Sequence, residues 1–462
     1  MGEDKRQTSL QRTLPWTAGV KPRGNQGAAV TPIARQRTES PMFPVKLMEV
    51  IVHAENVKKA LERVERNRGS GGVDGMETDK LRGHLKKNWL SLRSQLLSGT
   101  YKPKPVRRVE IPKPDGGKRQ LGIPTALDRF IQQAMLQVVQ SRWDESFSEH
   151  SYGFRPGRSA HQAVAKAQGY LADGHPYVVD IDLEKFFDRV NHDMLMSRLA
   201  KRIEDKRVLK LIRAYLNAGA MEQGLVKPTE QGTPQGGPLS PWMSNVVLDD
   251  LDCELERRGH RFVRYADDCN IYVKSERAGQ RVMESIKTFI ANKLKLKINE
   301  SKSAVARPGE RKFLGFSFTR SGKTPNRRKI APQALERFKT KIRVLTNRNR
   351  GKSIEQVVEE LSSYLWGWGG YFGFCQTRPV LMDLDSWLRR RLRCLMWRQW
   401  KVYRRRKAEL IKRGVGPEEA HCAAWCNRGP WPMSHIPAVR RALPNAYFDS
   451  LELPRLAEMG GI

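Results

Sequence analysis

The chain is poor in acidic residues and in long apolar runs. Its 462 residues carry 49 Asp and Glu against 84 Lys and Arg, which gives a formal net charge of +35. No apolar run approaches the ~20 residues that a membrane-spanning helix needs, and no signal-like apolar stretch opens the chain. Such an excess of positive charge indicates a polyanionic partner, and nucleic acid is the leading candidate.

Cysteine is also scarce. The six residues are Cys253, Cys269, Cys375, Cys394, Cys422 and Cys426. Their scatter favours a reducing cytoplasm over a disulfide framework. A zinc site can be drawn from His421, Cys422, Cys426 and His435. It is disfavoured, because a Cys-x3-Cys pair followed by one distant His is loose spacing for a structural site.

Two adjacent carboxylates occupy the most informative position in the chain. Asp267 and Asp268 lie between the runs Arg261–Arg264 and Cys269–Val273. Both runs are rich in β-branched and aromatic residues, so they predict two strands with the acids at the tip of a hairpin. An isolated Asp pair in a turn is usually structural, because Asp bonds its own backbone there.

A third carboxylate favours a functional role for this Asp pair over a purely structural one. Asp182 ends a strand predicted within Val178–Leu183, just before a helix expected to start within Glu184–Asp188. A phosphoryl-transfer site with two metals ~4 Å apart needs oxygen ligands from neighbouring strands. The three acids therefore predict a Mg²⁺ site.

A Gly/Pro-rich loop, Gln231–Pro241, lies between the two acidic strands and runs into the apolar segment Met243–Leu251. Glycines before the first turn of a helix let backbone N–H groups approach a phosphate or a base. Many Gly/Pro-rich segments, however, are simply turns that connect two elements.

Taken in order, these segments resemble the palm of a reverse transcriptase, in the form found in bacterial group II intron reverse transcriptase/maturases. The resemblance runs from about residue 48 to the C-terminus. Its six ordered motifs are Val109–Arg119, Leu121–Thr125, Ser151–Ser159, Asp180–His192, Gly232–Pro241 and Tyr265–Asp268. It implies that Asp182 and Asp267 hold two Mg²⁺ ions and that Asp268 completes the catalytic cluster.

The resemblance also implies contacts to the incoming nucleotide. Lys113 and Arg119 flank a Pro-Asp-Gly-Gly turn, and pairing of the flanking segments as a hairpin would direct both cations toward one triphosphate. Arg107 is a weaker third cation. Gln235, in the Gly-rich loop, is expected to contact the nucleotide, and Lys302 is expected to contact a phosphate.

Phe187 lies five residues beyond Asp182, where reverse transcriptases place a ring against the sugar. Such a ring leaves little room for a 2′-hydroxyl and favours dNTPs, whereas packing rules alone would assign Phe187 to the core. Further along, Phe313, Leu314 and Gly315 resemble the primer grip that positions the 3′-hydroxyl. A buried hairpin is the simple alternative.

A dense basic segment lies near the C-terminus. Trp387–Arg413 holds twelve Lys and Arg against one acid, Glu409. Its apolar residues share a helical face, so a helix can pack on one side and present cations on the other. This density favours phosphate contacts, and the predicted RNA-binding residues are Arg389, Arg390, Arg404 and Arg405. The region resembles the thumb and maturase domain of the family.

The predicted fold is α+β: a right-hand polymerase with fingers, an antiparallel palm sheet, a helical thumb/maturase domain and a small C-terminal DNA-binding region. The expected divisions are a basic, disordered arm (1–45), the N-terminal extension and fingers (46–165), the palm (166–322), the thumb/maturase domain (323–412) and the DNA-binding region (413–462).

The expected function is that of an RNA-directed DNA polymerase that binds its group II intron RNA, assists splicing and copies the intron by target-primed reverse transcription during retrohoming. Expected partners are intron RNA, an RNA template with a DNA primer, target DNA and dNTPs, in a bacterial cytoplasm and without a membrane. Many family members continue into a His-Asn-His nuclease. This chain stops first, so another source of primer is expected. The alternatives are a reverse transcriptase of a defence or diversification system, and an RNA-binding splicing factor without polymerase activity.

Overall fold

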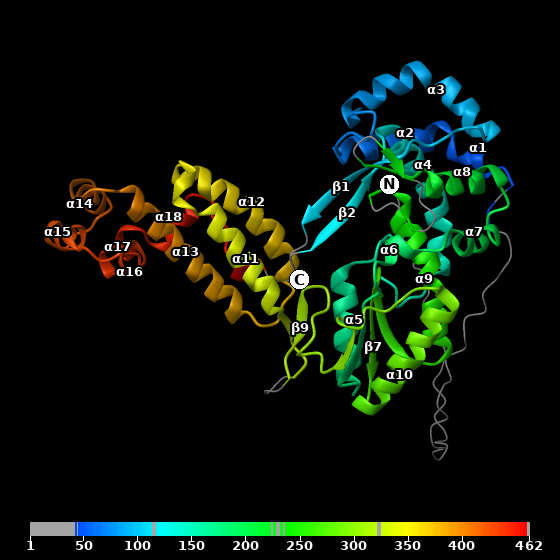
Figure 1. The fold of residues 1–462 in the computed structure, drawn as a ribbon. Coiled ribbons are helices and arrows are strands. Elements are labelled where there is room, and N and C mark those ends of the chain that lie inside the picture. Colours follow the sequence, from blue (N-terminus) through cyan, green and yellow to red (C-terminus); the bar gives the residue numbers. More distant parts are fainter. Residues whose placement is uncertain are drawn as a thin grey trace, which may run out of the picture. The chain divides into compact units, whose positions relative to one another are not determined.

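The structure is a computed structural model that describes residues 42–43, 45–112, 117–222, 225–227, 232–233, 236–320 and 325–459. Mixed helices and strands make up its first two thirds, and helices dominate the rest (Figure 1). The N-terminal elements are α1 (Leu47–Ile51), α2 (Ala54–Arg66), α3 (Leu81–Ser98), β1 (Val106–Pro112), β2 (Lys118–Ile123) and α4 (Ala126–Trp143).

The first sheet contains the predicted N-terminal hairpin. β1 and β2 pair antiparallel, with Arg107 opposite Ile123 and Pro112 opposite Lys118. Two short strands, β4 (Ala220–Glu222) and β5 (Leu225–Lys227), extend the sheet in the order β2-β1-β4-β5. The hairpin that the residues around the Pro-Asp-Gly-Gly turn predicted is therefore confirmed.

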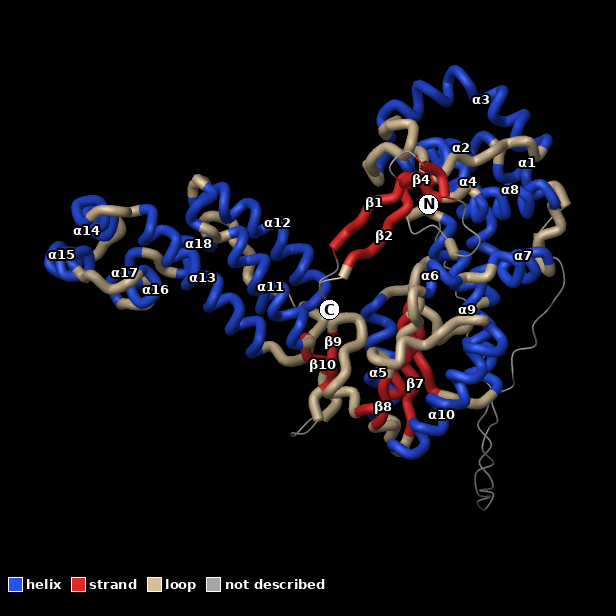
Figure 2. Tube along the Cα trace, viewed as in Figure 1, coloured by secondary structure: helices blue, strands red, loops and turns tan. Residues whose placement is uncertain are grey.

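The second sheet positions the acidic residues. Its strands are β3 (Tyr177–Ile181), β6 (Arg261–Tyr265), β7 (Asp268–Val273) and β8 (Ala304–Ala306). They lie in the order β6-β7-β3-β8, and each neighbouring pair is antiparallel. Figure 2 shows its strands in red beside helix α10. The predicted antiparallel palm sheet is confirmed.

The central part of the chain also contains α5 (Ala160–Ala172), α6 (Phe186–Arg189), α7 (His192–Ala200), α8 (Lys206–Asn217), α9 (Leu239–Arg257) and α10 (Glu276–Phe289). Of these, α5, α9 and α10 pack against the second sheet. α9 buries most of its length, and its residues share one hydrophobic core with α4 and β3. α10 ends at Phe289, and a π-type turn follows over Ile290–Leu294.

The C-terminal third forms a second core. After the hairpin of β9 (Phe316–Phe318) and β10 (Arg328–Ile330) come α11 (Pro332–Leu345), α12 (Ile354–Phe372), α13 (Pro379–Gln399), α14 (Tyr403–Lys412), α15 (Pro417–Trp425), α16 (Pro430–Met433), α17 (Pro437–Ala442) and α18 (Asn445–Asp449). Leu388, Leu392, Leu395 and Met396 are buried on one face of α13, as predicted.

One prediction needs correction, and another lies mostly outside the described residues. The basic segment Trp387–Arg413 is not one helix, because α13 ends at Gln399 and Val402 adopts an extended conformation (φ −108°, ψ 154°) before α14. The break keeps Trp400 in the core, where it is 4% exposed. The predicted arm 1–45 lies almost wholly outside the described residues. Its end is anchored, since Phe43 is buried and stacks on Trp143 with ring centroids 6.0 Å apart.

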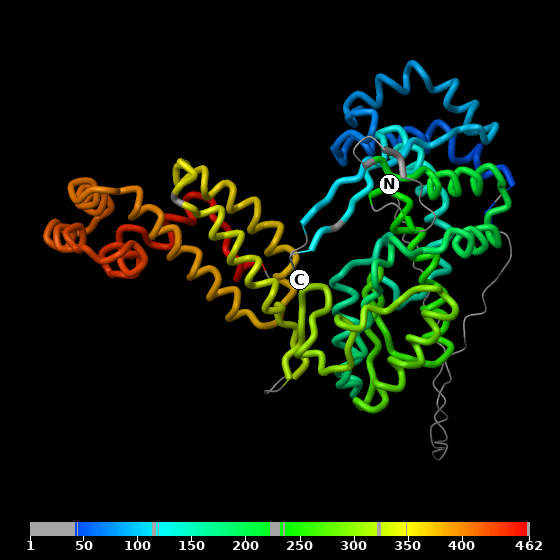
Figure 3. Tube along the Cα trace, viewed as in Figure 1, coloured from blue at the N-terminus to red at the C-terminus, as the bar shows by residue number. Residues whose placement is uncertain are grey.

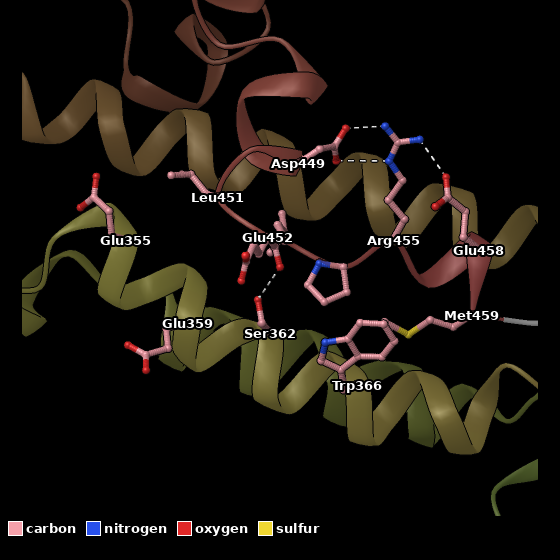
Figure 4. A pocket seen from close by; sticks show the side chains of 12 residues that line it. Glu355, Glu359, Ser362, Trp366, Asp449, Leu451, Glu452, Arg455, Glu458 and Met459 are labelled. Atoms are coloured by element: carbon pink, nitrogen blue, oxygen red, sulfur yellow. Dashed lines mark hydrogen bonds and ion pairs between the residues drawn. The ribbon is translucent and has the colours of Figure 1, made fainter.

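The last described residues fold back onto α12 and α13, as the red tube in Figure 3 shows. Asp385 of α13 accepts hydrogen bonds from the backbone N–H groups of Leu456 and Ala457, both at 3.0 Å. Between α12 and this segment lies a cavity of about 760 Å³, drawn in Figure 4. Glu355, Glu359, Glu452 and Glu458 line it, so this face repels phosphate.

Among the helices of the described residues, none is both long and apolar enough to cross a membrane.

Candidate active site

The register of the palm sheet brings the predicted catalytic acids together. Ile181 and Cys269 form the last pair between β3 and β7, so the next residues, Asp182 and Asp268, face each other beyond it. Asp267 lies in the two-residue turn between Tyr265 and Asp268, which pair across β6 and β7. The hairpin tip predicted for Asp267 and Asp268 is therefore confirmed, and Asp182 follows its strand directly.

The strand end at Asp182 is fixed by the segment that precedes β8. The Asp182 backbone N–H donates to Ser303 Oγ at 3.0 Å, and its carbonyl accepts from the Asn299 N–H at 2.8 Å. These bonds hold Asp182 at the sheet edge without using its carboxylate. The carboxylate thus stays available for ligands.

The turn that carries Asp267 is strained. Ala266 has φ 57°, in the left-handed region that costs a residue with a side chain about 1–2 kcal/mol. Gly153, from the predicted Ser151–Ser159 motif, packs against this turn, and a Cβ at Gly153 would lie 2.3 Å from the Ala266 nitrogen. A glycine at 153 is therefore required for the motif to support the turn.

A buried arginine stabilises the same turn. Arg264 has a fully buried side chain, and its Nη1 donates to the Ala266 carbonyl and to Asn245 Oδ1, both at 2.9 Å. Its other edge forms a bidentate ion pair with Asp252 of α9, at 2.7 and 2.5 Å. Asn245 in turn donates to the Gly153 carbonyl at 2.8 Å. One network thus ties β6, α9 and the Gly153 segment to the catalytic turn.

Arg264 was not among the predicted site residues. The signal for it was available, because an arginine inside an otherwise apolar strand must be paired when buried. Its partners could not be predicted, since Asn245 and Asp252 are a helix away in sequence and their approach depends on tertiary packing.

Negative charge is concentrated at the hairpin tip. The Asp268 residue is exposed at the hairpin tip, but neighbouring protein atoms displace much of the water around its carboxylate. This loss of hydration, followed by repulsion from Asp267, Asp180 and Asp182, raises the pKa of Asp268 to about 7. Burial also raises the pKa of Asp180, although Arg311 opposes the shift through an ion pair of 2.6 Å.

These carboxylates suit divalent cations. Mutually repelling oxygens at one sheet edge are relieved by a hard cation, and Asp180 already pairs with Arg311. Across the described ranges, no three His, Cys, Asp or Glu side chains form a group that could hold a metal ion by themselves. The metal site predicted from Asp182, Asp267 and Asp268 therefore stays a prediction.

Phe187 lies beside the Gly-rich loop. Phe186 is 2% exposed and fills the core, and Phe187 is half-buried against the same core. The Phe187 carbonyl accepts from the Thr233 N–H at 2.6 Å, which joins α6 to the Gly-rich loop. Gly232 has φ 93°, and a Cβ there would lie 2.8 Å from the Phe187 carbonyl oxygen. The loop is thus held against the backbone of Phe187.

The other predicted nucleotide contacts are only partly described. Lys113, Gln235 and the side chain of Arg119 lie outside the described part of the chain. Arg107 is exposed on β1, and its Nη2 lies 3.5 Å from Ser70 Oγ in the preceding loop. Lys302 is exposed, one residue before the Ser303 that bonds Asp182.

The predicted primer grip is the tip of a hairpin. Phe313 and Phe316 exchange backbone hydrogen bonds of 2.8 and 2.9 Å, and Leu314 and Gly315 form the turn with φ 52° and 81°. Tyr371 of α12 donates its hydroxyl to the Leu314 carbonyl at 2.8 Å. The turn therefore depends on the helical C-terminal region.

The four predicted RNA-binding arginines fall into two groups. Arg404 and Arg405 are exposed on α14, as a phosphate contact requires. The prediction that Arg389 contacts RNA is corrected, because the C-terminal segment folds over this residue. Arg389 is 3% exposed and pairs with Asp449 at 3.0 Å and with Asp385 at 3.5 Å. Arg390 stacks on Trp431, with its guanidinium carbon 4.1 Å from the ring centroid.

Two protein families match this chain. The family described as "Reverse transcriptase (RNA-dependent DNA polymerase)" matches residues 111–318, which include all three acids. The family described as "Group II intron, maturase-specific domain" matches residues 335–414, which cover α11 to α14.

Individual relatives match over different lengths. Protein YkfC of Escherichia coli (strain K12) is 33% identical over 300 residues, which cover 56% of this chain and 79% of that protein. Group II intron-encoded protein LtrA of Lactococcus lactis subsp. cremoris is 29% identical over 344 residues, and the match covers 60% of this chain and only 57% of LtrA. Nuclear intron maturase 2, mitochondrial, of Arabidopsis thaliana is 28% identical over 177 residues, covering 30% of this chain and 24% of that protein.

Taken together, the acidic cluster on an antiparallel sheet, the helical region that follows it and the two family matches lead to one assignment. The chain belongs to the group II intron reverse transcriptase/maturases and is an RNA-directed DNA polymerase.

Proposed function

We propose that the protein binds a group II intron RNA, assists its splicing and copies it into DNA by target-primed reverse transcription. The observation that carries this proposal is the presence, on one chain, of three carboxylates at one edge of the palm sheet and a maturase region with an exposed basic helix. A splicing factor with a decayed polymerase would have lost carboxylates. A defence-type reverse transcriptase would lack the maturase region.

In the proposed reaction, the primer 3′-hydroxyl attacks the α-phosphorus of a dNTP and pyrophosphate leaves. Asp182 and Asp267 would hold two Mg²⁺ ions, and Asp268 would complete the cluster. When bound, such ions lower the pKa of the attacking hydroxyl and stabilise the leaving group. The Phe313–Gly315 turn would position the primer end, while Lys302, Arg107 and the predicted residues Lys113, Arg119 and Gln235 would bind the nucleotide.

Phe187 is proposed to exclude ribonucleotides. Truncation of Phe187 to Ala opens space beside the sugar, and we expect incorporation of NTPs relative to dNTPs to rise at least about tenfold, in the range that small pocket changes produce. The measurement is single-nucleotide extension with matched dNTP and NTP, and Phe187→Leu should give an intermediate ratio. An unchanged ratio in a folded variant would remove Phe187 from the site.

Helix α14 is proposed to bind intron RNA through its exposed arginines. Replacement of Arg404 and Arg405 by Gln should weaken intron binding and reduce the slope of log affinity against log salt by roughly 1–2, because each lost phosphate contact releases about one counterion fewer. Splicing of the intron should fall, while extension of a preannealed primer on a generic template should change little.

The control for this test neutralises two other exposed arginines, Arg277 and Arg281 of α10, which packs on the palm sheet. It should leave intron binding and its salt slope unchanged. If the α14 variant instead splices normally and loses primer extension, α14 serves the polymerase duplex and this part of the proposal is wrong.

A further inference from the structure

A second cavity lies on the side of α13 that the C-terminal segment covers. Its volume is about 610 Å³, within the range of sites that hold a nucleotide-sized group. The residues that line it and carry the argument are Arg390, Arg393, Trp431, His435, Arg440 and Arg455. α13 supplies the first two, and the C-terminal segment supplies the others.

Cations outnumber carboxylates in this cavity. Asp383, Asp385 and Glu458 also line it, but Asp385 pairs with Arg389. Arg455 pairs with Asp449 and Glu458. For Arg390, Arg393 and Arg440, the described residues offer no carboxylate within the 4.0 Å of an ion pair. Arg440 is exposed at the rim, whereas Arg393 is only 9% exposed. A buried cation without a counter-ion is costly, so an anion is expected to complete the site.

The hydrogen bonds of Arg393 and Arg390 support this view. Arg393 donates to two neutral acceptors, the Leu443 carbonyl at 2.8 Å and Asn445 Oδ1 at 2.9 Å. Burial, followed by repulsion from Arg440 and Arg389, lowers the pKa of Arg393 to about 10. Among the described residues, the Nε atoms of Arg389 and Arg390 are buried without a hydrogen-bond partner.

The aromatic residue in the cavity narrows the choice of anion. Trp431 is 36% exposed, and Arg390 already stacks on it. Arginines beside an exposed tryptophan are the combination that binds a backbone phosphate together with a neighbouring base. An acidic peptide would not need the aromatic surface. The acidic cavity of Figure 4, which shares Arg455 and Glu458 with this one, would repel the same strand.

We propose that this arginine–tryptophan pocket, formed jointly by α13 and the C-terminal segment, binds a phosphate of a single nucleic-acid strand with the adjacent base on Trp431. The proposal deepens the function proposed above and rests on it, because it names a contact for the nucleic-acid partner. Intron RNA and target DNA share this chemistry, and the test separates them.

The test measures binding of short single-stranded RNA and DNA oligonucleotides by fluorescence anisotropy, with the full chain. Arg440→Gln and Trp431→Ala change side chains that are exposed, so folding should survive, and each should weaken binding at least about fivefold. Arg393→Gln should have a larger effect. Trp366→Ala is the matched control, since Trp366 is 63% exposed but lines the acidic cavity, and it should bind as wild type does.

Each outcome decides the proposal. If the variants lose affinity only for RNA, the pocket binds the intron, and if they lose affinity only for DNA, it binds the target. Weaker binding of both oligonucleotides means that the pocket accepts either kind of strand. Arg440→Gln and Trp431→Ala variants that bind both oligonucleotides as tightly as the Trp366→Ala control overturn the pocket. Wild-type protein that fails to bind intron RNA would instead overturn the proposed function. Extension on a preannealed template should be unchanged in all four variants.

Discussion

Replacement of Asp267 by Asn should abolish DNA synthesis while leaving RNA binding nearly intact. The change removes one oxygen ligand from the hairpin tip and keeps the shape of the side chain. Loss of a metal ligand removes several kcal/mol of transition-state stabilisation, and each 1.36 kcal/mol is tenfold in rate, so extension should fall on the order of 10³-fold. Binding should persist because the basic surface is untouched.

The measurement is extension of a DNA primer on an RNA template with dNTPs and Mg²⁺, beside filter binding of the same template. Asp193→Asn is the matched control, because the Asp193 side chain is 83% exposed on α7 and pairs with Arg213 outside the acidic cluster. It should extend at the wild-type rate. Full extension activity in the Asp267→Asn variant would contradict the assignment of the active site.

The positions of the three acids at the hairpin tip and strand end could be predicted from the sequence because their signals are local. The strands around Asp267 and Asp268 follow from residue type and alternation, and a hairpin brings its own ends together. The same holds for β1 and β2 and for the end of β3 at Asp182. Their order along the chain added the family resemblance, and the two family matches confirm it.

Other features depend on packing between distant segments and could not be predicted in this way. Arg389 was predicted to be a surface cation, but the C-terminal segment brings Asp449 over it. The break between α13 and α14, beside the buried Trp400, is likewise not shown by a helical pattern alone. Phe187 is half-buried against the core, so its burial alone does not decide between core packing and a place at the nucleotide site.

The second large effect is expected at Arg264, a positioning residue that does not touch substrate. In Arg264→Lys the ammonium can still pair with Asp252, but it cannot also reach Asn245 and the Ala266 carbonyl. A buried acceptor left without its donor costs about 1–3 kcal/mol, so the free energy of unfolding should fall by that amount. The turn would relax from φ 57° at Ala266, and a displacement of about 1 Å at the acids can cost on the order of 10²-fold in rate.

A titration of extension against Mg²⁺ separates misplacement of the acids from simple loss of folded protein. Misplaced carboxylates should raise the Mg²⁺ concentration at half-maximal rate and lower the maximum, with primer–template affinity unchanged. A smaller folded fraction would lower the rate equally at every Mg²⁺ concentration. Arg198→Lys is the matched control, because Arg198 Nε bonds Asp250 of the same helix α9 at 2.7 Å without reaching the turn. If both lysine variants show the same Mg²⁺ dependence as wild type, the Arg264 network serves stability alone, and the strain at Ala266 must be maintained by Gly153 and the β6–β7 pairing.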